Sequence, residues 1–403
     1  MQDPVIKAVE TDDELHQAND LMAKAHCADY FSGMEWLSST GQGYPDYLRE
    51  HTRVALWGGR VAAALRITTD TIRIGEARLR TGGIGWVTTA KSHRKRGLMA
   101  LVMDDALRYM REHRYHVSML FGIPDFYHRW GFATALAEYA TTIRAGEADA
   151  SPDPRHRVRN AKPGDIPVMN KIHLSNDSQT ACSLIRTTMH MANKWRRWAS
   201  ARVLTNQNGK VLGYFRGERQ GDVYVVDECG VADAALCGAL LNAAAREAHA
   251  QFLGVMRFCA PPDHPLIRHL VRFRSDHEMA THRDGNGMMA LVHTGETLES
   301  MIPEWESRLQ RHFPADGRAE ATLAVNRALF RVRAIHGAID VGPGSGANKF
   351  SLSPQELMQL ITGHRHLEEV LSTKRRIINQ DGLALLRVLF PKRSPFVWQA
   401  DRF

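Results

Sequence analysis

The sequence predicts an α+β protein made of two copies of one unit followed by a smaller α/β unit. A strand, a basic loop with a glycine and an amphipathic helix follow one another over residues 84–110. A hairpin pattern at residues 53–62 recurs at residues 202–213, each time after a helical stretch. Near residue 307 the pattern changes to paired strands and a well-capped helix.

The basic loop lies at residues 92–99, with the sequence Ser-His-Arg-Lys-Arg-Gly-Leu-Met. The β-branched and aromatic residues 84–89 before it indicate a strand. The helix after it is indicated by apolar residues at helical spacing, namely Leu98, Val102, Ala106 and Met110. The first N–H groups of a helix lack intrahelical partners and carry the positive end of its dipole, so they can bind phosphate. The loop therefore predicts a pyrophosphate site, with a solvated basic turn as the alternative.

A second motif follows about thirty residues later, at residues 121–132, where aromatic side chains surround Tyr127. Both motifs resemble those of the GNAT acyltransferase superfamily, whose acetyl-CoA loop reads Arg/Gln-x-x-Gly-x-Gly/Ala. Met99 departs from that pattern at its last position. The resemblance implies that Tyr127 faces the coenzyme sulfur and protonates the leaving thiolate; the alternative is a packed core tyrosine. The implied coenzyme-binding residues are Val87, Thr88, Thr89, Arg94, Lys95, Arg96, Gly97, Leu98 and Met99.

Length and composition predict a soluble protein of two or three domains. The chain has 403 residues, of which 44% are hydrophobic and 24% charged. No apolar window is long enough to span a bilayer, and the polar residues 1–14 do not resemble a signal peptide, so we expect a cytoplasmic protein. The five scattered cysteines include no C-x-x-C pair, which predicts reduced thiols rather than disulfides or a zinc site.

The net charge of +8 permits nucleic-acid binding, but the basic residues are spread among 44 acidic ones, and no nucleic-acid module is present. We therefore expect no nucleic-acid partner. The histidine pairs have no Cys or carboxylate partner at a metal-ligand spacing, so we expect no metal and solvent-facing histidines. These pairs are His113 and His116, His264 and His269, and His364 and His366.

The second copy lacks the chemistry of the first. No basic glycine loop follows its strand at residues 223–228, and no tyrosine stands in residues 258–264. We expect that this copy does not bind acetyl-CoA and instead shapes the substrate cleft. The Pro-containing residues 151–154 mark the boundary between the copies.

The third unit is predicted from alternating residues over 321–339 and from a helix with Ser353 as N-cap, Pro354 at its first position and Glu356 in a capping box. Gly363 ends that helix. This pattern resembles the sterol-carrier-like third domain of the enhanced intracellular survival (Eis) family of acetyltransferases.

The Eis resemblance covers the whole chain and implies domains at residues 1–152 (active GNAT), 153–295 (degenerate GNAT) and 296–403 (sterol-carrier-like). Family enzymes transfer acetyl groups from acetyl-CoA to amines, including aminoglycosides, and assemble as hexamers. They use the C-terminal carboxylate as catalytic base, which here belongs to Phe403. The family commonly has a Ser-Glu pair before the tyrosine, where this chain has Gly122 and Ile123.

The expected mechanism is direct attack of a primary amine on the acetyl thioester in a ternary complex. Glu35 and Trp36, in a loop expected after the first helix, are candidate substrate-binding residues; ordinary loop packing is the alternative. Two other functions stay open. One is acetylation of protein lysines or polyamines by the same residues, and the other is non-catalytic binding of an apolar ligand by the third unit.

Overall fold

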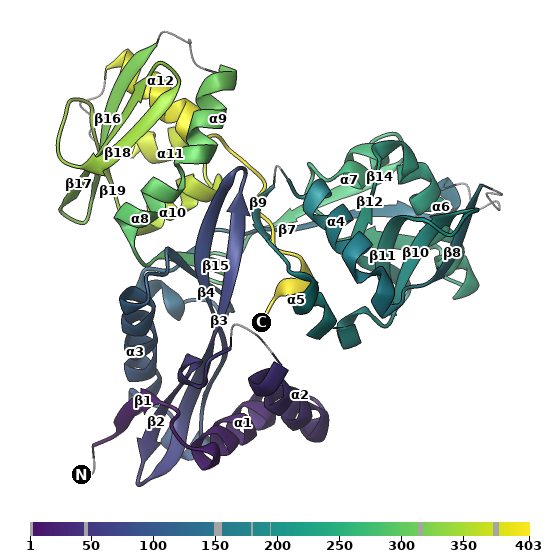
Figure 1. The fold of residues 1–403 in the computed structure, drawn as a ribbon, viewed down its shortest axis with the longest axis horizontal. Helices are drawn as coiled ribbons and strands as arrows, with labels where there is room; N and C mark the ends of the chain where they lie inside the picture. Colours follow the sequence, from purple (N-terminus) through teal and green to yellow (C-terminus); the bar gives the residue numbers. More distant parts are fainter. Residues whose placement is uncertain are drawn as a thin grey trace.

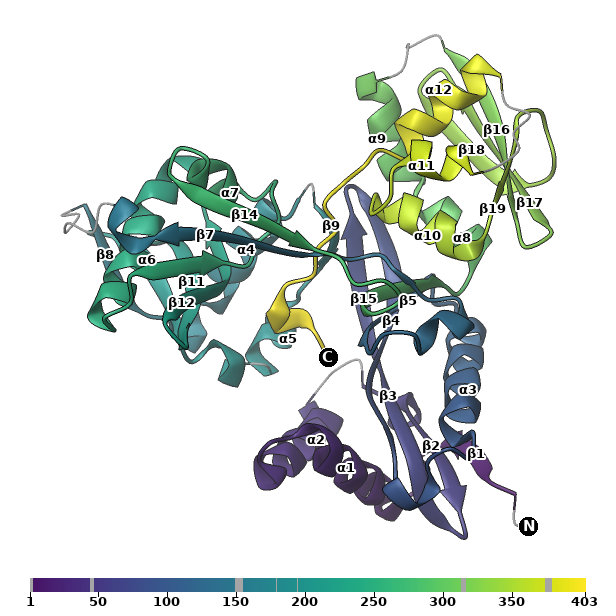
Figure 2. The same ribbon diagram turned by 180° about the vertical axis from the view of Figure 1, so that it is seen from behind.

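The computed structural model contains three β-sheets with their covering helices, one in each of three lobes (Figures 1 and 2). It describes residues 3–43, 47–148, 155–178, 180–193, 195–312, 317–373 and 379–403. The predicted boundary at residues 151–154 lies outside these described residues.

The first sheet has the strand order β1-β2-β3-β4-β5-β15-β6, and β9 pairs with β3 beside this path. Its strands are β1 (Val5–Ala8), β2 (Thr52–Trp57), β3 (Arg60–Ile74), β4 (Ala77–Thr89), β5 (Val117–Gly122), β6 (Ala133–Thr134), β9 (Ala181–Leu184) and β15 (Asn286–Leu291). Helices α1 (Asp12–His26) and α2 (Tyr30–Gly43) cover one face, and α3 (Leu98–Glu112) covers the other (Figure 1). The alternation of side chains along β3 explains both cores, since Ala63 packs under α3 while Ala64 packs under α1 and α2.

The local predictions for this sheet are largely confirmed. The first helix, the hairpin of β2 and β3, the strand before the basic loop and the helix after it all form. The expected loop around Glu35 and Trp36 is wrong, because both residues lie within α2. Its three glycines and three serines concealed the helical pattern, since these residues are poor helix formers in isolation.

The second sheet has the order β14-β7-β13-β12-β11-β10-β8. Its strands are β7 (Glu138–Arg144), β8 (His156–Asn160), β10 (Ala201–Asn206), β11 (Val211–Gln220), β12 (Val223–Val231), β13 (Val255–Phe258) and β14 (Ser275–Ala280). Its helices are α4 (Ile166–Asn176), α5 (Thr188–Asn193), α6 (Cys237–Ala250) and α7 (Pro265–Leu270). The hairpin of β10 and β11 after a helix matches the predicted repeat.

The first two sheets exchange strands. β7 follows the first sheet's β6 in sequence but pairs with β13 and β14 of the second sheet. In return β15, which follows β14, pairs with β5 and β6, and β9 pairs with β3. The two units are therefore held together by backbone hydrogen bonds as well as by side-chain packing.

The third sheet has the order β18-β17-β16-β19. Its elements are α8 (Thr294–Ser300), α9 (Ile302–His312), β16 (Arg318–Val325), β17 (Ala328–Ile335), β18 (Ala338–Pro343), β19 (Lys349–Leu352), α10 (Pro354–Thr362), α11 (Leu367–Ser372) and α12 (Gln380–Leu389). The predicted capping box of α10 is confirmed, with Ser353 as N-cap and Gly363 at the end in a left-handed conformation. Its core is continuous with the end of the first sheet, through residues such as Ile72 and Val117.

After α12, the last residues run back between the lobes and end beside the first sheet (Figure 2). Phe396 N–H donates to the carbonyl of Ala181, and Trp398 Nε1 donates to Asp177 at 2.8 Å. The chain end is thus docked along its length and lies at the centre of the molecule.

Among the described residues, no helix is both long and apolar enough to cross a membrane, and no group of three or more candidate ligands is arranged to hold a metal ion. The expectation of solvent-facing histidines is wrong for His264, which is fully buried as the N-cap of α7. Its Nδ1 accepts a hydrogen bond from the N–H of Leu266 at 3.3 Å, a capping role normally taken by Ser, Thr, Asp or Asn.

Candidate active site

The site begins where β4 and β5 separate. Their parallel pairing runs from Thr81 opposite Val117 to Gly83 opposite Met119 and ends there, although β4 continues to Thr89. The backbone of β4 beyond Gly83 therefore has an edge that no strand within the described residues covers. An uncovered strand edge of this kind offers N–H and C=O groups to a ligand that lies between the two strands.

A β-bulge interrupts β4 at this place. Trp86 and Val87 together stand opposite the single residue Leu65, and Trp86 has a positive φ of 58°. Bulges turn the strand and free backbone groups, and they are frequent beside active sites. The structure thus places the predicted residue Val87 within the bulge and Thr88 and Thr89 just after it, where pairing with β3 resumes at Thr88.

The predicted phosphate loop lies between the end of β4 and α3. Gly97 is the N-cap of α3 with a φ of 77°, a conformation that glycine adopts without strain. The first helical hydrogen bonds are donated by Ala100 and Leu101 to the Gly97 carbonyl, so the N–H groups of Leu98 and Met99 precede them. Arg94, Lys95, Arg96 and Gly97 are exposed, whereas Leu98 is buried and anchors the helix.

Side-chain contacts shape this loop. Arg94 Nε donates to the Thr89 carbonyl at 3.3 Å, and the Arg96 guanidinium lies 5.2 Å from the centre of the Trp57 ring. Met99, the departure from the family pattern, is half-buried and packs against the core under α3. Its bulk is accommodated by the protein core beneath the helix.

Tyr127 opens a short 3₁₀ helix, η3 (Tyr127–Trp130), after β5. It is 7% exposed, and burial raises the pKa of its hydroxyl to about 12. Its ring lies against Gly122, where a Cβ would come within 2.4 Å of Cε2. A side chain at position 122 of this chain would therefore displace the tyrosine ring from its present place.

Phe403 ends the chain against β4. A Cβ at Gly85 would lie 3.2 Å from the carboxyl carbon of Phe403, and one at Gly83 would lie 2.4 Å from Cζ of its ring. The Phe403 ring also meets that of Phe121 edge to face, with the centroids 6.1 Å apart. Adjacent residues of β5, Phe121 and Gly122, therefore contact the two predicted catalytic residues.

A pocket of about 500 Å³ opens beside the chain end. The first unit contributes His26 and Trp86, and the tail contributes Arg402 and Phe403. The second unit contributes the charged residues Arg197, Arg216, Glu218 and Asp227, which sequence reasoning did not identify. Arg216 and Asp227 form a bidentate ion pair with both distances at 2.7 Å.

The two candidate substrate residues of α2 differ in position. Trp36 packs against Trp86 with the ring centroids 5.2 Å apart, and the Arg197 guanidinium lies 5.4 Å from the Trp36 ring centre. Trp36 thus supports two residues of the pocket wall. Glu35 instead forms an exposed ion pair with Arg196 at 3.1 Å and does not line the pocket.

Comparison with known proteins agrees with this geometry. Residues 8–135 match the model of the acetyltransferase (GNAT) domain family. The fold matches structures of GCN5-related N-acetyltransferases from Kribbella flavida (16% identity, TM-score 0.75) and Anabaena variabilis (15%, 0.75). It also matches Eis1 from Mycobacterium abscessus (14%, 0.67), and all three comparisons cover 100% of both chains. A comparison with curated proteins found no match.

Residues 8–135 are a GNAT acetyltransferase domain, in a chain with an Eis-like fold. The predicted α+β fold class and the class of enzyme, an acetyl-CoA-dependent acetyltransferase, are confirmed. The division into three domains and the roles of individual residues stay predictions.

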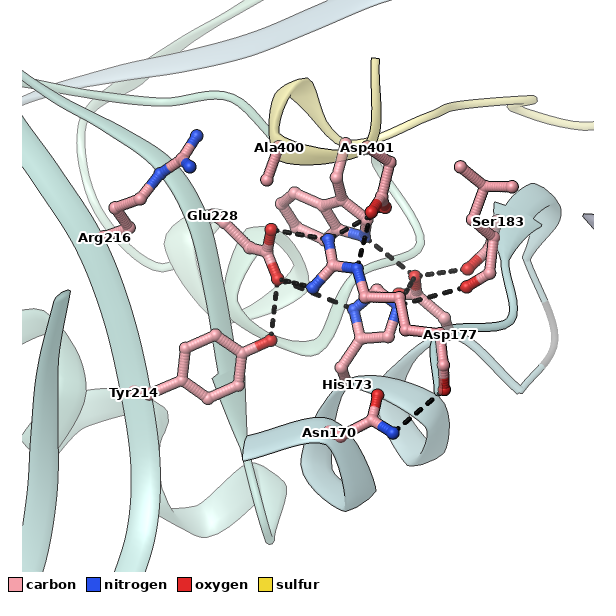
Figure 3. A network of polar contacts seen from close by, with 12 residues as sticks. Asn170, His173, Asp177, Ser183, Tyr214, Arg216, Glu228, Ala400 and Asp401 are labelled. Carbon is pink, nitrogen blue, oxygen red and sulfur yellow. Dashed lines mark hydrogen bonds and ion pairs between the residues drawn. The ribbon is translucent and has the colours of Figure 1, made fainter. Parts of the chain in front are cut away.

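A buried polar network fixes the chain end relative to the second unit (Figure 3). Arg186, between β9 and α5, donates two hydrogen bonds to Glu228 of β12 and two to Asp401 of the last 3₁₀ turn, η8 (Gln399–Asp401). All three side chains are at most 1% exposed. Although burial lowers it, the Asp401 and Glu228 carboxylates raise the pKa of Arg186 well above its ordinary value.

Two uncharged side chains, Tyr214 and His173, lie beside this ion triad. The Tyr214 hydroxyl donates to Glu228 at 3.0 Å. Burial, and then the charge of Arg186, lower the pKa of His173 to about 4, so His173 is neutral at pH 7. Sequence reasoning missed the network because its three charged members come from separate segments, and only folding brings them together.

We predict that Arg186→Leu lowers the free energy of unfolding by about 3–5 kcal/mol, because it leaves two carboxylates buried without a counter-charge. Urea titration at pH 7 measures this change. Arg196→Leu is the matched control, since it removes the exposed pair with Glu35, for which about 0–1 kcal/mol is expected. Equal effects of the two variants would contradict a stabilising role for the buried network.

Proposed function

We propose that this chain transfers an acetyl group from acetyl-CoA to a primary amine by direct attack in a ternary complex. One observation carries the proposal. The uncovered edge of β4 runs from the contact with Phe403 at Gly85, through the bulge, to the loop that begins α3. A coenzyme lying along this edge would have its pyrophosphate at the α3 N-terminus and its thioester near the chain end.

The coenzyme end of the site is suited to a dianion. Arg94, Lys95 and Arg96 provide exposed positive charge beside the free N–H groups of the first helical turn. The left-handed Gly97 has no heavy atom within 4 Å of its would-be Cβ, so the space over the loop is open to a ligand.

In the reaction, the amine nitrogen bonds to the carbonyl carbon of the thioester, and the carbon–sulfur bond breaks. Backbone N–H groups near Val87 to Thr89 would stabilise the negative charge on the carbonyl oxygen. Tyr127, kept protonated by its raised pKa, would give its proton to the departing sulfur. The Phe403 carboxylate would accept the amine proton through a water, since an unperturbed α-carboxyl has a pKa of about 3.3–3.7 and is ionised at pH 7.

The pocket beside Phe403 favours a small amine. It contains Arg197, Arg216 and Arg402 together with Glu218, Asp227 and the terminal carboxylate, so its charge is mixed rather than strongly acidic. An aminoglycoside is one acceptor to test. A zwitterionic amine, a polyamine and a lysine peptide are the other acceptors to test. The zwitterionic amine is included because a polycation gains less from a lining of mixed charge.

The experiment that tests the function is incubation with acetyl-CoA and this panel of amines, read by release of free thiol and by product mass. Turnover of one amine with a mass gain of one acetyl group supports the proposal. Absence of turnover together with absence of stabilisation by acetyl-CoA would favour the rival function, binding of an apolar ligand. Light scattering measured alongside tests the hexamer that the Eis resemblance implies.

We predict that Gly97→Asp weakens acetyl-CoA binding and leaves the fold intact. The substitution forces a left-handed conformation on a residue with a side chain and puts a negative charge at the phosphate site. Calorimetric titration measures the affinity, and Gly146→Asp, at a glycine with equally open surroundings, is the control. Unchanged acetyl-CoA affinity in Gly97→Asp would show that the coenzyme binds elsewhere.

Replacing Tyr127 by Phe should lower kcat by about 10²–10⁴ without weakening acetyl-CoA binding, because only the proton donor to sulfur is lost. Steady-state kinetics and thermal unfolding of the same sample separate this effect from packing. A variant that melts at a lower temperature but turns over normally would identify Tyr127 as a structural residue.

Conversion of the C-terminal carboxylate to an amide, by adding a tag after Phe403, should abolish most acetyl transfer and leave acetyl-CoA binding intact. The same tag at the N-terminus is the matched control. If the C-terminally tagged protein were as active as the control, the base would have to be sought among other carboxylates, with Glu218 and Asp227 as the first candidates.

A further inference from the structure

A second cavity, of about 590 Å³, lies between the second and third units and shares no lining residue with the acetyl-transfer pocket. In Figure 1 the second unit's α7 and the third unit's α9 and α12 face this junction from opposite sides of the C-terminal tail. Basic side chains dominate its wall. They are Arg268 of α7, Arg308 and Arg311 of α9, Arg387 of α12, and Arg393 of the tail.

Arg308 is the most deeply placed of these residues, with 3% of its surface exposed. Its Nε donates to Glu304 at 2.7 Å, and its Nη1 donates to the Leu389 carbonyl. Its Nη2 is buried without any hydrogen-bond partner. Leaving a buried charged donor unpaired is unfavourable, and in folded proteins such a group usually has a water, an ion or a ligand as partner.

The carboxylates around the cavity do not balance the arginines. Glu304 forms ion pairs with both Arg308 and Arg393, the latter at 3.4 Å. Arg387 is paired with Glu368 at 2.7 Å. Asp263, the carboxyl group in the wall, also has a buried oxygen without a partner, and burial raises its pKa.

Two exposed arginines, Arg268 and Arg311, carry most of the positive charge that no carboxylate balances. Arg311 bonds to the carbonyl and hydroxyl oxygens of Ser307, which are neutral. Arg268 has no carboxylate within ion-pair distance in the part of the chain that the structure describes. Both side chains are exposed and stand at the cavity from opposite units.

We propose that this cavity binds a small phosphate-bearing anion between the second and third units. The forked guanidinium group matches the oxygens of phosphate in bidentate fashion, and several arginines around one cavity provide for a doubly charged group. The ligand would be either free phosphate or the phosphoryl group of a small ester, and it would supply the partner that Arg308 Nη2 lacks.

The test measures binding of inorganic phosphate and of glycerol 3-phosphate to the full chain by calorimetry. The ionic strength is kept constant with chloride, and acetyl-CoA is present at saturation so that the α3 loop is occupied. We expect one anion per chain, and tighter binding of one of the two probes distinguishes free phosphate from an ester. Arg268→Gln/Arg311→Gln should weaken binding by about tenfold or more, because each lost charge-assisted contact is worth about a factor of ten.

Arg272→Gln/Arg318→Gln is the matched control, since it removes two exposed arginines that do not line the cavity. It should leave the affinity unchanged. Equal weakening by both double variants, or binding no stronger than that of chloride, would overturn the proposal. The proposal would also be wrong if the unmodified chain did not bind phosphate and the Arg268/Arg311 variant dissociated from an oligomer. The arginines would then contact a second copy of the chain.

Discussion

The bridge that Arg186 makes between Glu228 and Asp401 is the interaction on which the proposed active site depends. Each carboxylate belongs to a different part of the chain, one to a central strand of the second sheet and the other to the last turn. Three charges at most 1% exposed are tolerated only because the geometry is complete, with four hydrogen bonds from one guanidinium. The bridge therefore fixes the tail in one place.

Because Glu228 helps to hold the chain end, the second unit contributes to the proposed active site without a coenzyme site of its own. Its strand β12 carries Glu228 to the tail and Asp227 to the pocket wall, from adjacent residues at an irregularity in the pairing of β12 with β11. The exchanged strands β7 and β15 then hold this unit at a set distance from β4. A change in that distance would move Asp401, and with it the chain end.

The sequence was sufficient to predict the elements with strong local signals. The Gly97 loop, the capping box of α10 and the two matching hairpins are set by neighbouring residues, and all are confirmed. The strand exchange was not predictable, because β7 and β15 have ordinary strand patterns and nothing local specifies their partners. Arg186 was missed for a similar reason, since its partners are 42 and 215 residues away.

The same limit applies to the glycines of the site, which look like ordinary strand glycines in the sequence. In the structure Gly83 and Gly85 admit the ring and carboxyl group of Phe403 against β4, and Gly122 admits the ring of Tyr127. Gly83 and Gly85 are required by Phe403, which lies far along the chain, and Gly122 is required by Tyr127, which lies beyond the next loop. Space beside the strand, rather than backbone flexibility, is what these glycines provide.

A chain end is normally the least ordered part of a protein, so its proposed use as a base needs a specific restraint. From Asp401 to Phe403 there are two residues, which span at most about 7 Å when extended. Arg197 donates to the carbonyls of Ala400 and Arg402 at 3.2 and 3.0 Å, on either side of the buried Asp401. With the Phe403 ring packed at Gly83, the terminal carboxylate is held from both sides, and little conformational entropy remains to be lost when an acceptor binds.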